Sequence, residues 1–296
     1  MLFIMDSIFS IKEFDFERKR GIVWVCDLTG SSKYLNDNSL AEKLEAFLPR
    51  LYWISSIIVE AAGGQFIKWT GDGFLAWFET SLHRELGMRS SAVFEALWYL
   101  TFIVNVTQLG IKSERKFLIR HGVTYEHDAL ITKITYQDGH TSIDLIGRAV
   151  VLAFRLSSVR VLFPFVVTQK EIVTAYKKEN FSMISFKKWT PTQNDCLRYF
   201  KSEKWGINTL FSPSNPKNKT TKSLPSLIKE SKRVIEEAEG VRKPRRADSV
   251  FIKLFLEQLI AGPEWCRSIE SDLIKFLRND FLETLKKSAD FLEQNK

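Results

Sequence analysis

Two aspartates occupy positions from which a fold could bring carboxylates together for phosphate chemistry. Asp27 ends an apolar run and precedes the turn sequence TGSS at 29–32, and Asp72 lies in the sequence GDG between two other apolar runs. Carboxylates bind Mg²⁺ or Mn²⁺, and the backbone N–H groups of a glycine-containing turn bind phosphate oxygens. Two metal ions held side by side stabilise the attacking and leaving oxygens of a displacement at phosphorus. Either aspartate alone is more simply a turn residue, so the hypothesis requires that both act together.

The elements expected around these aspartates are strands and helices of one sheet-containing domain. The apolar run at 21–28 predicts a buried strand, and an Asp-Gly turn between apolar runs predicts a β-hairpin over 65–78. Helical periodicity predicts helices at 40–62, 90–109, 147–159 and 169–178, and further strands are expected at 117–125, up to 146, at 165–168 and at 181–189. This mixture of elements predicts an α/β or α+β fold with a mixed sheet.

The positive charge is distributed unevenly and helps to divide the chain. The 296 residues carry a net charge of +8, and most of the excess falls in 201–246, which holds 12 Lys and Arg against 5 Asp and Glu. That stretch is also rich in Pro, Ser, Asn and Thr, so we interpret it as a linker. We therefore expect an N-terminal segment at 1–17, a main domain at 18–200, the basic linker at 201–246 and a helical appendage at 247–296. A basic segment with few aromatic residues supports nucleic-acid binding less well than it supports a solvated linker, so no nucleic-acid partner is expected.

Composition points to a reducing compartment away from the membrane. The three cysteines are far apart and the four histidines have no zinc-ligand spacing with them, so neither a disulfide framework nor a zinc site is expected. The longest apolar stretch, 97–106, is shorter than the roughly 20 residues of a membrane span. The N-terminus lacks the positive charge of a signal peptide. We expect a cytoplasmic protein.

Three sequence blocks in order resemble the class III nucleotide cyclases. They are DLTGSS at 27–32, GGQFIKWTGDGFLAWF at 63–78 and DLIGRAVVLAFRLSS at 144–158, and the aspartates of the first two lie 45 residues apart. The resemblance covers about 18–200. It implies a mixed, mainly antiparallel sheet flanked by helices, to which the C-terminal helical extension is added.

The resemblance also implies roles for individual residues. Asp27 and Asp72 would bind two Mn²⁺ or Mg²⁺ ions per active site, with help from the Leu28 carbonyl. Arg155 would stabilise charge on the α-phosphate in the transition state, a role suited to guanidinium. The phosphates would lie against the turn formed by Thr29, Gly30, Ser31 and Ser32.

The candidate base and ribose residues are Tyr52, Lys68, Asp144 and Val151. Lys68 and Asp144 match the base-reading positions of adenylyl cyclases, although an outward strand lysine and a helix-entry carboxylate are equally acceptable interpretations. Val151 stands where the family has a ribose-orienting asparagine, which leaves a degenerate site as an alternative. Tyr52 would narrow the base pocket, although core packing is the simpler explanation of a mid-helix aromatic. Lys187 and Lys188 match a family lysine for the triphosphate, but solvated strand ends are favoured.

Among class III cyclases, the chain most resembles the pyrimidine cyclases of the bacterial Pycsar antiphage system. This implies UTP as the favoured substrate, CTP as the alternative, and a cyclic nucleotide product that a separate effector reads in antiphage defence. It also implies a homodimer whose sites are shared between chains. Purine cyclization, a catalytically inactive nucleotide sensor and a nucleic-acid-binding module are the competing hypotheses.

Overall fold

The computed structural model describes residues 11–29, 31, 38–107, 119–159, 166–178, 186–189 and 210–213, together with a few isolated positions nearer the C-terminus. The strands are β1 (Ile11–Leu28), β2 (Gln65–Trp69), β3 (Phe74–Glu79), β4 (Ile119–Tyr136), β5 (Thr141–Ile146), β6 (Val166–Gln169), β7 (Phe186–Trp189) and β8 (Leu210–Pro213). The helices are α2 (Asn38–Ala61), α3 (Leu86–Thr107), α4 (Arg148–Ser157) and α5 (Lys170–Lys178), with the short 3-10 helix η2 (His83–Glu85).

The described strands form one eight-stranded sheet that is mainly antiparallel. Its order is β2-β3-β1-β4-β6-β8-β7, and β5 pairs with β4 beside this path. The β4–β6 pair is parallel, whereas the other described pairs are antiparallel. The predicted α/β class with a mainly antiparallel mixed sheet is therefore confirmed.

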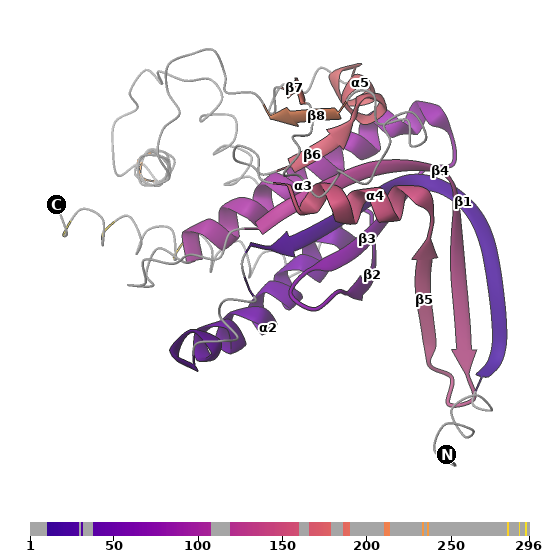
Figure 1. Ribbon diagram of the computed structural model, residues 1–296, viewed down its shortest axis with the longest axis horizontal. Coiled ribbons are helices and arrows are strands. Elements are labelled where there is room, and N and C mark those ends of the chain that lie inside the picture. The colour runs from indigo at the N-terminus through magenta and orange to yellow at the C-terminus, as the bar shows by residue number, and fades with distance from the viewer. Residues whose placement is uncertain are drawn as a thin grey trace.

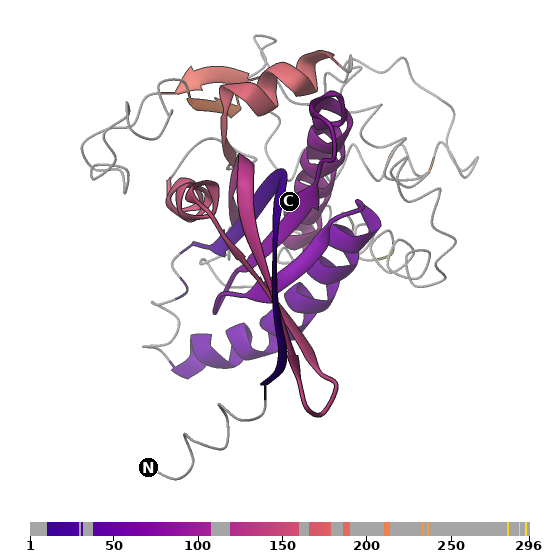
Figure 2. The same ribbon diagram turned by 90° about the vertical axis from the view of Figure 1, so that its right-hand side faces the viewer.

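Helices cover both faces of this sheet (Figures 1 and 2). Alternate residues of β1 point to opposite faces, as a strand requires. Trp24 lies in the cluster that β1 shares with α2, α3 and α5, whereas Val23 and Val25 lie in the cluster that packs on α4. Both faces of this central strand are therefore buried, which explains its continuous apolar sequence.

A long ribbon made of β1, β4 and β5 projects beyond the helix-covered part of the sheet (Figures 1 and 2). Residues 11–18 of β1 are exposed and pair with 130–136 of β4. The sequence predicts strands only at 21–28 and 117–125, so the ribbon is longer than predicted. A buried strand has a continuous apolar sequence, whereas the strands of this ribbon are mostly exposed and have none.

Two differences concern segment boundaries. Strand β1 begins at Ile11, within the segment 1–17 that the sequence separates from the main domain, and β8 lies inside the predicted linker at 201–246. The predicted helical appendage at 247–296 lies outside the described residues apart from isolated positions. None of the described helices is long and apolar enough to cross a membrane.

Candidate active site

The two predicted metal-binding aspartates lie beside each other at one end of the central strands. Asp27 is the penultimate residue of β1, and Asp72 lies in the tight turn between β2 and β3, where the Thr70 N–H donates to the Gly73 carbonyl at 2.9 Å. A Cβ atom on Gly73 would lie 2.1 Å from the Cys26 carbonyl oxygen and 3.1 Å from Asp27 Cα. Only glycine permits this approach, so the sequence GDG places Asp72 directly against the end of β1.

The negative charge of Asp72 acts on the pKa of Asp27. Burial raises the pKa of Asp27 above its ordinary value of 3.8, the neighbouring Arg120 lowers it, and the negative charge of Asp72 raises it again. Desolvation and a like charge both disfavour the ionised carboxylate. The arrangement therefore favours a cation between the two aspartates.

Arg120 is a site residue that the sequence analysis does not identify. It stands opposite Asp27 in the β1–β4 pairing, and its Nη2 donates to Asp27 Oδ2 at 2.7 Å while its Nη1 donates to the Ser158 carbonyl at 2.8 Å. The Arg120 side chain is only 13% exposed. Its register opposite Asp27 is the signal that would have found it, and register requires knowing which strands pair.

Unpaired polar atoms surround the same end of β1. Within the described residues, Arg120 Nε and Thr29 Oγ1 are buried without a hydrogen-bond partner. Buried polar atoms without partners are costly, and phosphate oxygens could satisfy these two. Thr29 and the half-buried Ser31 belong to the predicted phosphate turn, whereas Gly30 and Ser32 lie outside the described residues.

Tyr52 reaches the hairpin from α2. Its hydroxyl donates to the Gly71 carbonyl at 2.5 Å, and its ring lies 3.8 Å from the Trp69 ring, centroid to centroid. Burial raises the pKa of Tyr52, and the charge of Asp72 raises it further. Tyr52 therefore lies next to the turn that carries Asp72 rather than in the packed core.

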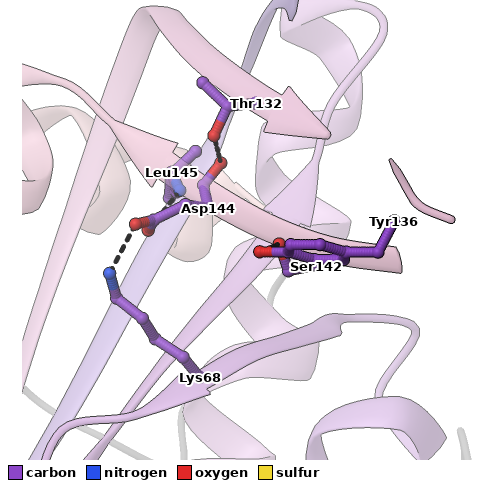
Figure 3. Close-up of polar contacts among 6 residues, drawn as sticks. All are labelled: Lys68, Thr132, Tyr136, Ser142, Asp144 and Leu145. Carbon is purple, nitrogen blue, oxygen red and sulfur yellow. Dashed lines mark hydrogen bonds and ion pairs between the residues drawn. The ribbon is translucent and has the colours of Figure 1, made fainter. Parts of the chain in front are cut away.

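Lys68 and Asp144, the candidate base-reading residues, form an ion pair between β2 and β5 (Figure 3). Lys68 Nζ lies 2.6 Å from Asp144 Oδ2, and the other carboxylate oxygen accepts the Leu145 N–H at 2.7 Å. Both side chains are more than two-fifths exposed. The sheet thus brings together two residues that are 76 positions apart in sequence, at a place that solvent and a ligand can reach.

Helix α4 presents Val151 and Arg155 on its outer face. Both residues are exposed, although the sequence around Arg155 is apolar. The spacing of four residues puts them on one face, opposite the buried residues Ala149 and Ala153. The helix is therefore buried on one face, and the Arg155 side chain points away from the core.

Helix α4 packs closely on β4 and is hydrogen-bonded to it. A Cβ atom on Gly122 would lie 2.0 Å from the Ala153 carbonyl oxygen, and Thr124 Oγ1 donates to the Ala149 carbonyl at 2.8 Å. Glu126 accepts the Ala149 N–H at 2.7 Å, which puts a negative charge at the positive end of the helix. Glu126 is a second residue that sequence reasoning misses, because its role depends on the packing of α4 over β4.

The donor set at Asp27 and Asp72 fits a hard divalent cation. Two carboxylates and a backbone carbonyl, that of Leu28, are oxygen ligands of the kind that Mg²⁺ and Mn²⁺ accept. No cluster of three or more His, Cys, Asp and Glu occurs in the described ranges. A metal here would thus take its remaining ligands from water or substrate, as Mg²⁺ commonly does at phosphate sites.

Solved structures with a similar fold include two adenylyl cyclases. The adenylyl cyclase CyaB from P. aeruginosa is 18% identical, with a TM-score of 0.51 over 70% of this chain and 99% of that one. A bacterial light-regulated adenylyl cyclase is 13% identical, with a TM-score of 0.50 over 67% of this chain and 52% of that one. This chain thus matches about half of the light-regulated protein.

Neither a protein-family model nor a curated protein sequence matches the chain. At these sequence identities the structural similarity concerns the fold, while site residues must be argued from their own geometry. The described part of this chain has the fold of the class III nucleotide cyclases.

Proposed function

We propose that the protein is a nucleotide cyclase that converts a nucleoside triphosphate to its 3′,5′-cyclic monophosphate and pyrophosphate. The observation that carries this proposal is the meeting of Asp27 and Asp72 at the end of β1, on a class III cyclase fold. In the reaction, the ribose 3′-oxygen bonds to the α-phosphorus, and the bond from that phosphorus to the β-phosphate's bridging oxygen breaks. The 3′-hydroxyl proton passes to solvent and pyrophosphate leaves.

The residues around Asp27 suit a triphosphate. Asp27 and Asp72, with the Leu28 carbonyl, would hold two Mn²⁺ or Mg²⁺ ions, which supply acidity to the 3′-hydroxyl and neutralise phosphate charge when bound. Arg120 fixes the Asp27 carboxylate by the 2.7 Å ion pair. Its unpartnered Nε and the Thr29 hydroxyl offer donors to phosphate oxygens. The backbone of the turn from Thr29 to Ser32 would bind the same phosphates.

Arg155 and the aspartates would complete a site between two chains. In one chain, Asp27 is paired with Arg120, whereas Arg155 is exposed on α4 beside the exposed apolar Val151. A guanidinium on an outer face can act on the substrate of a second copy. We therefore propose a two-fold homodimer with two equivalent shared sites.

The substrate proposed first is a pyrimidine nucleotide, UTP before CTP. Support comes from the sequence resemblance to Pycsar cyclases and from Val151 in place of a ribose-orienting asparagine. On this basis the product would be cyclic UMP, a second messenger that a separate effector reads in antiphage defence. Lys68 and Asp144 would contact the base, and their ion pair would open or rearrange to receive it.

The second candidate is a purine cyclase. The Lys68–Asp144 pair favours it, because these residues match the base-reading positions of adenylyl cyclases and lie 2.6 Å apart. A lysine donor and a carboxylate acceptor together complement the ring nitrogen and exocyclic amine of adenine. The two candidates differ in the base alone and share the reaction.

One experiment separates these candidates. The purified protein is incubated with Mn²⁺ and with ATP, GTP, CTP or UTP in separate reactions, and products are identified by mass spectrometry, with Asp72→Asn as the inactive control. We expect cyclic UMP from UTP. A cyclic purine as the sole product would refute the pyrimidine assignment, and nucleotide binding without any cyclic product would indicate the inactive sensor.

A further inference from the structure

The turn that carries Asp72 is supported unevenly by the sheet. It joins β2, which is the terminal strand in the described sheet order and is only partly buried, to β3, which is almost fully buried. Gly71 has a φ of +84°, and a Cβ atom placed on it would meet nothing within 4 Å. One side of the turn is packed against Cys26 through Gly73, so the Gly71 side requires another contact.

Tyr52 supplies that contact from outside the sheet. Its hydroxyl lies 2.5 Å from the Gly71 carbonyl oxygen, one residue before Asp72. The bond joins α2 to the turn across 19 positions of sequence. It therefore holds the turn at Gly71, in addition to the contact that Gly73 makes with β1.

The direction of the Tyr52 hydroxyl is set by aromatic stacking. The Tyr52 and Trp69 rings lie 3.8 Å apart at 30°, and Trp69 in turn lies 4.4 Å from Phe66 and 6.0 Å from Phe74, edge-on to the latter. Phe74 is fully buried and contacts the ring of Trp24. A ring fixed by such packing loses little further entropy when its hydroxyl bonds, so the bond is preorganised.

We propose that Tyr52 is a positioning residue, whose hydroxyl bond to Gly71 and stacking on Trp69 hold the β2–β3 turn so that Asp72 stays beside Asp27. The role rests on the proposed function, because it acts on a metal-binding carboxylate. It also differs from the base-pocket role that the sequence suggests, since the hydroxyl is directed at the protein backbone rather than at a nucleotide base.

The test removes the hydroxyl and keeps the ring, with Tyr52→Phe. The matched control is Ser56→Ala, on the same helix, which also removes a hydroxyl bonded to a backbone carbonyl, that of Trp53 at 2.9 Å, without touching the hairpin. The first measurement is hydrogen exchange of the peptide covering 70–73, with no metal and no nucleotide. We expect faster exchange there in Tyr52→Phe, and exchange at the wild-type rate in Ser56→Ala. Unchanged exchange in Tyr52→Phe would overturn the positioning role.

The second measurement is Mn²⁺ binding in the presence of inorganic triphosphate, followed by the electron paramagnetic resonance signal of free Mn²⁺. Losing one neutral hydrogen bond is expected to weaken Mn²⁺ binding by about 3- to 10-fold. Excess Mn²⁺ should restore the turnover number, while the KM for nucleotide at saturating Mn²⁺ stays near the wild-type value. An altered nucleotide KM with unchanged Mn²⁺ affinity would overturn the proposal in favour of base contact.

The two proposals fail in different ways. A wild-type protein that neither binds Mn²⁺ with triphosphate nor makes a cyclic nucleotide refutes the cyclase function. Faster exchange at 70–73 in Tyr52→Phe would still support the hydroxyl's hold on the turn in that case. Conversely, an active wild-type enzyme whose exchange and Mn²⁺ affinity are insensitive to Tyr52→Phe refutes the positioning role alone.

Discussion

The aspartate region and the α4 region differ in the direction they face. At the end of β1, Asp27 is ion-paired to Arg120 within the chain, and Asp72 is pressed against it by the Gly73 approach. On α4, the helix is fixed just as closely by β4, yet Val151 and Arg155 are exposed. One region is arranged around a site in its own chain, and the other presents a guanidinium outward. In the proposed homodimer, a complete site would combine the aspartates of one copy with the α4 face of the other.

The strongest test of this comparison is complementation between chains. Asp72→Ala and Arg155→Ala should each lower the rate by about 100-fold or more, because each removes a proposed metal ligand or the proposed transition-state cation. Heterodimers of the two variants, isolated through two different affinity tags, should recover about half of the wild-type activity, since one of two sites is intact. The measurement is cyclic nucleotide formed per heterodimer.

Inactive heterodimers would place the aspartates and Arg155 of one site in the same chain. Heterodimers of Asp72→Ala with Asp27→Ala provide the matched control. They carry both lesions in the aspartate region, so neither site has a full set of aspartates. Activity from that pair would contradict the assignment of both aspartates to one half of the site.

A second prediction concerns the strand that serves both regions. On β4, Arg120 pairs with Asp27, and Gly122 allows the close approach of α4. His121 lies between them, is fully buried and accepts the Trp24 indole N–H at 3.1 Å. Its other ring nitrogen lies 2.8 Å from the Thr101 hydroxyl. Burial lowers the pKa of His121 from its ordinary 6.5 to about 3.

This shift makes stability depend on pH in a defined direction. As pH falls below 6.5 the unfolded chain takes up a proton at His121, whereas the folded protein does not until about pH 3. Stability is therefore lost across that range, by about 2 kcal/mol between pH 7 and pH 5. Urea unfolding at both pH values measures it. His121→Gln should show a smaller pH dependence, whatever its stability at pH 7. Equal slopes in both proteins would mean that His121 is not the group responsible.

The third prediction concerns the ion pair that distinguishes the aspartate region. Arg120 lowers the pKa of Asp27 against burial and the charge of Asp72. Arg120→Gln should therefore move the acidic limb of the pH–rate profile upward by about one pH unit or more. It should also reduce activity above that limb by about 10-fold, through loss of a charged donor near the phosphates. A lower rate with an unshifted limb would show that Arg120 acts on substrate alone.

The sequence predicts those elements whose burial produces a recognisable apolar pattern. The apolar run of β1, the Asp-Gly hairpin and the four helices appear near their predicted positions because each has a buried face or a specific turn. Residues 11–18 of β1 are exposed and form no apolar run, so the sequence predicts no strand there. The Asp138-Gly139 turn between β4 and β5, with Gly139 at a φ of +84°, is a hairpin signal that the sequence prediction does not use. Arg120 and Glu126 were missed for another reason: their partners, Asp27 and the α4 N-terminus, are fixed by strand register and helix packing. Single-sequence periodicity carries no such information.

The smallest expected effect belongs to Glu126, whose replacement tests whether α4 can be perturbed without the aspartate region. Glu126→Ala removes the acceptor of the Ala149 N–H and should cost about 1 kcal/mol of stability.

Because Glu126→Ala loosens α4 and not the hairpin, its effect on activity should depend on which region of that chain the intact site uses. In heterodimers with Arg155→Ala, the intact site uses the α4 of the Glu126→Ala chain, so activity should fall about 2- to 5-fold further. In heterodimers with Asp72→Ala, the intact site uses the other chain's α4, so activity should stay near that of the Asp72→Ala heterodimer with wild type. Equal losses in both pairings would mean that α4 and the aspartates are coupled within one chain, and that the two regions do not act as separable halves of the site.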